Sequence, residues 1–409
     1  MSNPYAALQI RDYRQFVSAR FCVTLAIQIQ AVVVGWQVYE ITKDPLSLGL
    51  IGLAEALPSI SVSLYAGHLA DIVQRKRIIV ITMTTLLICS IALLFFTTNT
   101  GEFILHNGVF PIYAIIFISG IARGFITPAN FSFMPQLVPR ELYQNAVSWN
   151  STLWEMASIC GPPIGGLIYG FFGITAAYSV DVALMFMGVM FLMTVADRPI
   201  PPVTEEQGVS DKIKAGLQFV FQNKIILGAI TLDLFAVLFG GAVALLPIFA
   251  DQILDVGKIG LGFLRSAPGI GAVLTALYLT YNPIKKSMGR ILLYSVAGFG
   301  LCMIFFAVSR NFWLSMGVLA ISGAFDCVSV IVRGTLLQTL TPENMKGRVS
   351  AVNNIFIGSS NEIGAFESGV AARVLKVVPS VIFGGVMTLL VVGFTAWKAP
   401  SLRKLEKVN

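Results

Sequence analysis

Charged side chains are scarce in this sequence. Only 12% of its 409 residues are Asp, Glu, Lys or Arg, whereas 56% are hydrophobic and the mean hydropathy is +0.79. A soluble globular domain carries about 25% charged residues. Because the deficit extends over the whole length, the composition excludes an ordinary soluble protein and indicates an integral membrane protein.

The residues of metal, nucleotide and hydrolytic chemistry are also sparse. Histidine occurs only at His68 and His106, and the five cysteines have the spacing of neither a metal site nor a disulfide framework. No Gly-x-x-x-x-Gly-Lys-Ser/Thr loop is present, which argues against intrinsic ATP hydrolysis. A membrane enzyme would need a nucleophile with a base, or a metal cluster, and the sequence offers neither. We therefore expect no metal, no cofactor and no enzymatic activity.

The net charge of +7 does not indicate nucleic-acid binding. The cations stand between hydrophobic runs rather than along one basic face, and anionic lipid at the cytoplasmic surface explains them better.

Apolar segments long enough to span a bilayer occur twelve times. They fall at roughly 15–39, 46–70, 78–97, 109–127, 143–170, 174–194, 225–250, 260–281, 290–308, 312–336, 350–372 and 379–397. The sequence thus predicts an all-α integral membrane protein with six helices in residues 1–196 and six in residues 224–409. The polar stretch 197–223 is the expected cytoplasmic linker. It contains an amphipathic helix whose apolar face carries Val209, Ile213, Leu217 and Val220.

Orientation follows from the positions of Lys and Arg. With the N-terminus inside, 19 of the 28 cations fall on the cytoplasmic side and 5 on the outer side. Short loops rich in Lys and Arg stay in the cytoplasm, so both termini are expected there, in a bacterial inner membrane.

The two halves of the sequence repeat. A shift of 203 residues brings Pro139, Asn150, Gly161 and Gly166 onto Pro342, Asn353, Gly364 and Gly369. Matching span counts and these identities predict two pseudo-symmetric six-helix bundles produced by duplication.

The hairpin between the second and third spans carries a distinctive motif, Gly67-x-Leu-Ala-Asp71-x-x-x-Arg75-Lys76. It resembles the loop 2–3 signature of the major facilitator superfamily, although Ile72 and Gln74 depart from the consensus. The resemblance implies that Gly67, Asp71, Arg75 and Lys76 form a cytoplasmic latch between the halves. The alternative is an ordinary positive-inside turn. The equivalent loop of the second half keeps cations but lacks the Asp.

The fifth span contains Ala157-x-x-x-Gly161-Pro162-x-x-Gly165-Gly166. It resembles the motif of the superfamily's antiporters. Small residues four apart let helices approach closely, and proline removes a backbone donor and bends a helix. Plain close packing is the alternative interpretation.

Two further segments resemble the enterobactin-exporter-like, proton-coupled efflux branch of the superfamily. One runs from Gly120 to Leu142, and the other from Thr341 to Val349. The resemblance to the superfamily covers nearly the whole chain and implies a transporter.

Seven acids fall within the predicted spans, and on lipid-facing surfaces they would together cost on the order of 20 kcal/mol. They should therefore line the interior. Arg123 resembles the buried arginine of drug/proton antiporters. Asp326 and Arg333 share a helix face and are a candidate ion pair, and Asp181 is expected to be structural. The candidates for proton coupling or the cavity are Glu55, Arg123, Glu155, Asp233, Asp326, Glu362 and Glu367.

Together these features predict a secondary transporter that works as a monomer by alternating access. We expect proton-coupled export of an amphipathic small molecule such as a siderophore or drug, with protons and membrane lipids as the other partners. The alternatives are an importer or lipid-type transporter of the same fold, and a non-transporting receptor or scaffold.

Overall fold

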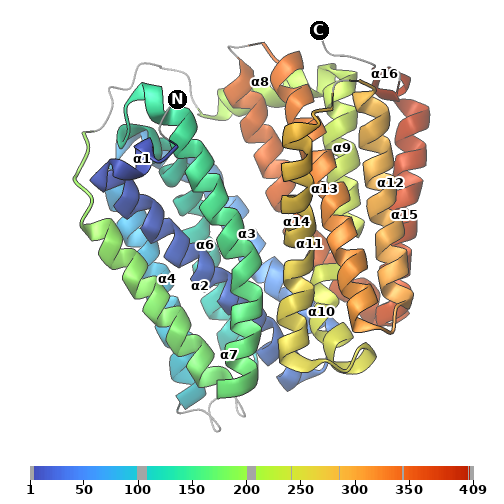
Figure 1. Ribbon diagram of the computed structural model, residues 1–409, viewed down its shortest axis with the longest axis horizontal. Coiled ribbons are helices and arrows are strands. Elements are labelled where there is room, and N and C mark those ends of the chain that lie inside the picture. The colour runs from blue at the N-terminus through green and yellow to red at the C-terminus, as the bar shows by residue number, and fades with distance from the viewer. Residues whose placement is uncertain are drawn as a thin grey trace. The chain divides into compact units, whose positions relative to one another are not determined.

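The structure is a computed structural model that describes residues 4–98, 108–199, 209–240, 242–284, 286–342, 345–403 and 405. Helices dominate these ranges, and no strand occurs in them (Figure 1). A helix satisfies its own backbone hydrogen bonds, which is the requirement that lipid imposes on a spanning segment.

The N-terminal half begins with a short helix and continues with long ones. They are α1 (Ala6–Gln9), α2 (Arg11–Thr42), α3 (Pro45–Ile72), α4 (Arg75–Thr98), α6 (Phe110–Phe133), the 3₁₀ turns η1 (Met134–Gln136) and η2 (Arg140–Leu142), and α7 (Tyr143–Met193).

The C-terminal half follows after a helix in the linker region. Its elements are α8 (Val209–Gln222), α9 (Lys224–Phe239), η3 (Ala242–Leu245), α10 (Leu246–Ile248), η4 (Phe249–Ile253), α11 (Gly257–Tyr281), α12 (Met288–Val308), α13 (Phe312–Leu340), α14 (Lys346–Leu375), α15 (Val377–Lys398) and α16 (Pro400–Arg403).

Ten segments among the described residues are long and apolar enough to cross a membrane. One of them contains α7, which holds two of the predicted spans, because Gly173 has non-helical angles (φ 84°, ψ 175°) and divides it into two helical arms. α14 is 30 residues long but too polar to count among the ten. With these two additions, each of the twelve predicted spans contains a helix, and the chain is a multi-pass membrane protein.

The seventh predicted span is not one uninterrupted α-helix. α9 ends at Phe239 with Gly240 as its C-cap, and the helical path resumes through η3, α10 and the π-helical η4. Glycine is a poor helix former, which explains why α9 ends at Gly240. Pro247, which lacks a backbone donor, lies in the first turn of α10, where that donor is not needed.

Two compact units divide the chain. Unit 1 comprises Met1–Lys43, Ala54–Glu206 and Gly257–Ser266, and unit 2 comprises Asp44–Leu53, Gln207–Val256 and Ala267–Asn409. Residues 44–53 therefore cluster with the C-terminal half and residues 257–266 with the N-terminal half. The expected division at residues 196 and 224 remains a prediction.

The interior of unit 1 is centred on α2, which packs along α7. Tyr13 and Phe16 of α2 are fully buried there, and the Phe16 ring meets the Phe133 ring edge-on with centroids 5.6 Å apart. Such edge-to-face pairs add about 0.5–1.5 kcal/mol beyond the burial of their area.

In unit 2 the C-terminal part of α8 packs against neighbouring helices. Val220 is 1% exposed and clusters with Ile226 and Ile230 of α9 and with Val349 and Val352 of α14. At this end of α8 the apolar residues of the predicted amphipathic helix therefore contact α9 and α14.

The outward surfaces carry large apolar side chains. Phe131 is 81% exposed, Phe172 is 76% exposed and Trp397 is 71% exposed. Aromatic exposure of this extent suits contact with lipid.

Candidate functional site

The first candidate feature is an ion pair inside unit 1. Arg123 of α6 donates to Glu55 of α3, and their side chains are 23% and 22% exposed. Gly120 and Gly124 bring the two helices together, because a Cβ at Gly120 would lie 2.8 Å from Pro58 Cγ. Two of the predicted coupling residues, 68 positions apart in the sequence, therefore meet as a partly accessible charge pair.

A second ion pair lies inside unit 2, where Arg333 of α13 contacts Asp233 of α9. Arg333 therefore pairs with Asp233 and not with Asp326, the candidate on its own helix. Seven residues along a helix correspond to a rise of about 10 Å, which is too far for contact, whereas α9 presents Asp233 directly to the guanidinium.

Three further candidate acids have no ion-pair partner among the described residues. Asp326 of α13 is exposed, and Glu155 of α7 and Glu367 of α14 are partly exposed. Glu362 lies beside the N-terminal end of α3, with its Oε2 3.3 Å from the position of a Cβ at Gly52. Each of these carboxyl groups is therefore at least partly exposed within its own unit.

The antiporter-like motif of α7 forms a close seam inside unit 1. A Cβ at Gly165 would lie 3.1 Å from Ile29 Cα, and one at Gly166 would lie 2.7 Å from Lys258 O. From the other side, a Cβ at Gly262 would lie 3.0 Å from Pro163 Cα. The glycines thus let α7 touch the backbones of α2 and of residues 257–266, with Gly161 against Gln28 in the same seam.

Pro162 lies within continuous helical backbone. The only residue of α7 with non-helical angles is Gly173. The missing backbone donor of Pro162 therefore does not break the helix.

Polar side chains connect α2 and α7 along this seam. Arg20 donates to Asn150 Oδ1, and Gln28 Nε2 lies 3.1 Å from Ser158 Oγ. The Tyr13 hydroxyl donates to the carbonyl of Ala146 at 2.6 Å. Spacings of four and eight residues along α7 place these groups on one face.

Asp181 of α7 is fully buried, at 0% exposure. Its Oδ2 accepts from Gln30 Nε2 at 3.1 Å, and Gln30 also donates to Ser90 Oγ at 3.2 Å. Two turns closer to the end of α2, Gln37 accepts from the Tyr178 hydroxyl at 2.6 Å. Gln30, Ser90, Gln37 and Tyr178 are not among the candidate site residues predicted from the sequence. Two glutamines on a membrane span, seven residues apart, were the available signal.

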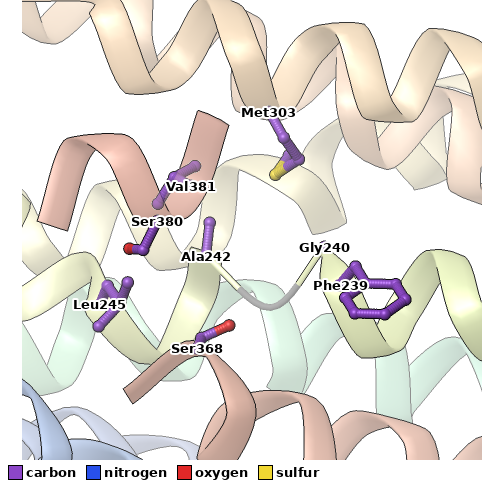
Figure 2. A pocket seen from close by; sticks show the side chains of 8 residues that line it. All are labelled: Phe239, Gly240, Ala242, Leu245, Met303, Ser368, Ser380 and Val381. Atoms are coloured by element: carbon purple, nitrogen blue, oxygen red, sulfur yellow. The ribbon is translucent and has the colours of Figure 1, made fainter. Parts of the chain in front are cut away.

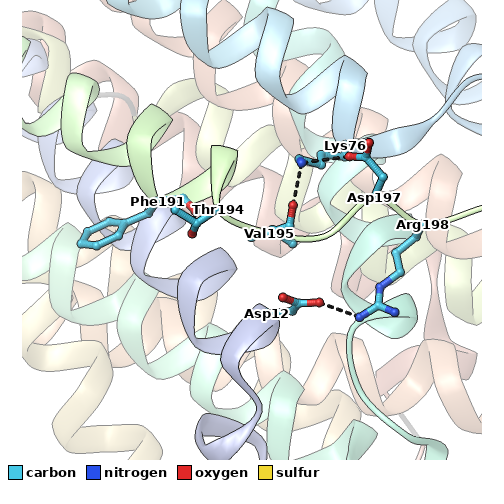
Figure 3. A network of polar contacts seen from close by, with 7 residues as sticks. All are labelled: Asp12, Lys76, Phe191, Thr194, Val195, Asp197 and Arg198. Atoms are coloured by element: carbon cyan, nitrogen blue, oxygen red, sulfur yellow. Dashed lines mark hydrogen bonds and ion pairs between the residues drawn. The ribbon is translucent and has the colours of Figure 1, made fainter.

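The cytoplasmic hairpin is described in part. The side chains of Gly67 and Asp71 lie outside the described ones. Arg75 donates to the carbonyl of Ser132 at 3.1 Å. Lys76 donates to the carbonyl of Val195 at 2.6 Å and pairs with Asp197 at 2.9 Å (Figure 3).

A neighbouring pair in the same network joins Asp12 to Arg198 at 2.7 Å (Figure 3). Lys76 and Arg198 therefore hold the residues after α7 to the rest of unit 1. A latch between the halves through Asp71 remains a prediction.

A polar cluster lies where α2 ends and α11 begins. The Tyr169 hydroxyl donates to Glu40 Oε2 at 3.0 Å, and Lys258 Nζ is 3.7 Å from Glu40 Oε1. The Lys258 ammonium also lies 4.2 Å from the centre of the Tyr169 ring, a cation–π arrangement.

A small pocket in unit 2 opens beside the break after α9. Eight residues line it, with Ser368 and Ser380 as the polar ones (Figure 2). It has room for about one water molecule, so it is too small for an organic substrate.

No group of three or more His, Cys, Asp or Glu side chains that could hold a metal ion occurs in the described part of the chain. The candidate features are the Glu55–Arg123 pair and the glycine seam in unit 1 and, separately, the Asp233–Arg333 pair in unit 2.

Comparison with known proteins identifies the family. The model of the family described as "Transmembrane secretion effector" matches residues 2–409. The chain is 25% identical over 383 residues to the enterobactin exporter EntS of Escherichia coli O1:K1 / APEC, covering 93% of this chain and 90% of that protein. It is 25% identical over 381 residues to the enterobactin exporter EntS of Shigella boydii serotype 18, with the same coverage.

Solved transporter structures have the same fold. The POT family transporter PepTSo superposes with a TM-score of 0.74 at 12% identity, covering 96% of this chain and 98% of that one. The nucleoside transporter NupG gives 0.72 at 14% identity, with 94% and 99% covered. The D-xylose-proton symporter gives 0.71 at 14% identity, with 95% and 97% covered.

Proposed function

This chain belongs to the transmembrane secretion effector family of the major facilitator superfamily, and we propose that it exports an amphipathic small molecule in exchange for protons. Siderophores and drug-like compounds are the proposed cargo.

The export direction is supported by the relatives, which are named as exporters of enterobactin and match over 93% of this chain. The glycine seam of α7 supports it too, since the motif resembles that of antiporters. The excess of Lys and Arg on one side supports cytoplasmic positions for both termini, with the protein in a bacterial inner membrane. The transporter is proposed to act as a monomer.

Proton coupling rests on one observation, the partly accessible pair of Glu55 with Arg123. When Glu55 takes up a proton, it loses its negative charge and no longer pairs with Arg123. The unpaired Arg123 charge then changes the electrostatic field at the helices around it. Alternating access then links protonation to movement of the cargo. A single charge that crosses 100 mV supplies about 2.3 kcal/mol.

The test is transport by the purified full chain in liposomes. Enterobactin and ethidium serve as a siderophore probe and a drug-like probe, and an imposed pH gradient is the driving force. We expect at least one probe to accumulate on the acidic side, and a protonophore to abolish the accumulation. No gradient-dependent movement of either probe contradicts proton-coupled export of these classes.

Substitutions then identify the coupling residue. Glu55→Gln, Glu155→Gln, Asp233→Asn and Glu362→Gln are tested one at a time, and at least one should abolish gradient-driven movement while leaving the protein folded. Intact transport in all four contradicts the assignment of coupling to these acids. Probe movement against the expected direction indicates an importer. Binding without any movement indicates a receptor or scaffold.

A further inference from the structure

Arg20 of α2 is a span arginine whose partner is neutral. Arg123 and Arg333, by contrast, each pair with an acid. Arg20 donates to Asn150 Oδ1 on α7, and no acidic side chain lies within ion-pair distance of it among the described residues. A charge without compensation inside a membrane span is costly and usually marks a functional position.

The acids nearest to Arg20 along its own helix and along α7 do not supply the missing charge. Asp12, about two turns before Arg20 on α2, pairs with Arg198. Glu155 lies five residues after Asn150, which places it about 140° around α7 from the residue that binds Arg20. Glu155 also makes no ion pair in the described part of the chain.

The Arg20 side chain is partly exposed, whereas the two rings that precede it on the same helix face are fully buried. Phe16 and Tyr13 are 0% exposed, and Arg20 Cζ lies 6.0 Å from the centre of the Phe16 ring. Long side chains lean toward the N-terminus of their helix, so an arginine that reached for the membrane surface would need the space that these rings fill. The guanidinium is instead held beside α7, where it donates to Asn150.

Polar and aromatic side chains continue from Arg20 along both helices, at the four-residue spacing that keeps them on one helix face. These partly or fully exposed residues are Thr24 and Gln28 on α2 and Asn150, Trp154 and Ser158 on α7. Together with Arg20 we call them the Arg20 stripe. Gln28 Nε2 lies 3.1 Å from Ser158 Oγ, and Trp154 is 47% exposed. A small number of placed polar groups beside aromatic surface is typical of ligand sites.

We propose that Arg20 recognises an anionic group of the cargo and that the Arg20 stripe contacts the rest of the molecule. A planar guanidinium forms charge-assisted hydrogen bonds, often two in parallel, with a carboxylate or another oxyanion. Trp154 offers an aromatic face to the apolar part of the same molecule. The cargo class is therefore an amphipathic aromatic acid. This inference rests on the proposed export, narrows its cargo and makes Arg20 a specificity-determining residue.

Binding of two matched probes to the purified full chain in detergent tests the proposal. 1-Naphthoate is an aromatic anion at neutral pH, and 1-naphthamide has the same rings without the charge. Isothermal titration calorimetry should show that naphthoate binds about tenfold more tightly than naphthamide, because a hydrogen bond to a charged group contributes more than a neutral one. Equal affinities, or no binding of naphthoate, would overturn the proposal.

Arg20→Gln is the decisive variant, because an amide keeps a donor for Asn150 and removes the charge. The preference for naphthoate should disappear in Arg20→Gln and be retained in part in Arg20→Lys. Arg14→Gln is the matched control, since Arg14 is an exposed cation on the same helix, and it should keep the full preference. A preference that persists in Arg20→Gln, or that is equally lost in Arg14→Gln, would overturn the proposal.

Photolabelling of the wild type provides a second measurement should Arg20→Gln fail to fold. The probe is 4-azidobenzoate, an aromatic acid that attaches to nearby residues on illumination. Label within residues 18–30 or 147–158 that naphthoate prevents and naphthamide does not prevent supports the proposal. Label elsewhere, or equal protection by both probes, overturns it.

An anionic lipid headgroup has the same chemistry as an acidic cargo. Naphthoate binding to the wild type is therefore repeated with phosphatidylglycerol added to the detergent. Unchanged binding supports recognition of the cargo. Displacement of naphthoate by this lipid would assign Arg20 to a headgroup and overturn the proposal.

The outcome is separable from that of the proposed function. Gradient-driven movement of enterobactin or ethidium by the wild type, together with equal affinities for the two naphthalene probes, defeats anion recognition and leaves the proposed export standing. A naphthoate preference that depends on Arg20, in a wild type that moves neither enterobactin nor ethidium, supports anion recognition and contradicts the proposed export.

Discussion

Arg333 and Asp233 form an ion pair whose two side chains are only 4% and 7% exposed. The pair joins α13 to α9 within unit 2. Removing the charge of one partner of a buried ion pair leaves the other charge uncompensated in the interior. Replacing both partners with apolar residues is often tolerated.

Asp233→Asn should therefore destabilise the protein by about 3–5 kcal/mol. The apparent melting temperature of the detergent-purified chain measures this, with the exposed Glu141→Gln as the control. The double variant Asp233→Leu, Arg333→Leu should be more stable than Asp233→Asn alone. A single variant as stable as the wild type would show that the pair has little structural importance.

Gly262→Ala should reduce both stability and transport. The added Cβ would lie 3.0 Å from Pro163 Cα, and backbone cannot move aside as easily as a side-chain end. Overpacking of this kind costs about 1–3 kcal/mol. Gly317→Ala is the matched control, because a Cβ there meets nothing within 4 Å. Equal behaviour of the two variants in melting and transport would argue against a functional seam.

Asp71→Asn should impair the transport cycle more than binding of the cargo. The reason is the proposed latch, which acts on conformation and not on the substrate. Binding of enterobactin to the purified variant and its transport in liposomes are compared with those of the wild type. Equal loss of binding and transport would count against a latch. The variant Glu141→Gln, purified and reconstituted in the same way, again serves as the control.

Orientation is tested by reporters at the C-terminus. The 19 cations on the expected cytoplasmic side predict a cytoplasmic C-terminus. Green fluorescent protein fused there should fluoresce, and alkaline phosphatase fused there should be inactive. The opposite pair of results would reverse the topology.

The sequence allowed the fold to be predicted, because each span is a local property of about 20 residues and the lipid solvent admits only helices there. The break after α9 was not predicted, since hydropathy averages over Gly240 and Pro247. The two arms of α7 were placed correctly, because Gly173 separates two apolar runs.

The site could be predicted only as a set of residues. Glu55 and Arg123 were both named, but their contact depends on how α3 and α6 pack, which spacing along the chain does not reveal. For Arg333 the same helix offered only Asp326 as a candidate partner, and the contact with Asp233 depends on how α9 and α13 pack. Asp181 was expected to be structural, and its hydrogen bond from Gln30 appears only when α2 and α7 come together.

The single residue that joins the arms of α7 leaves that connection without slack. Gly166 of the seam lies seven residues before Gly173, and Asp181 lies eight residues after it, so each is about 10–12 Å from the joint. No loop lies between the two arms, so any change in the angle between them must occur at Gly173 itself. The fifth and sixth spans thus share one glycine joint, with a buried carboxyl group two turns to one side and a helix contact two turns to the other.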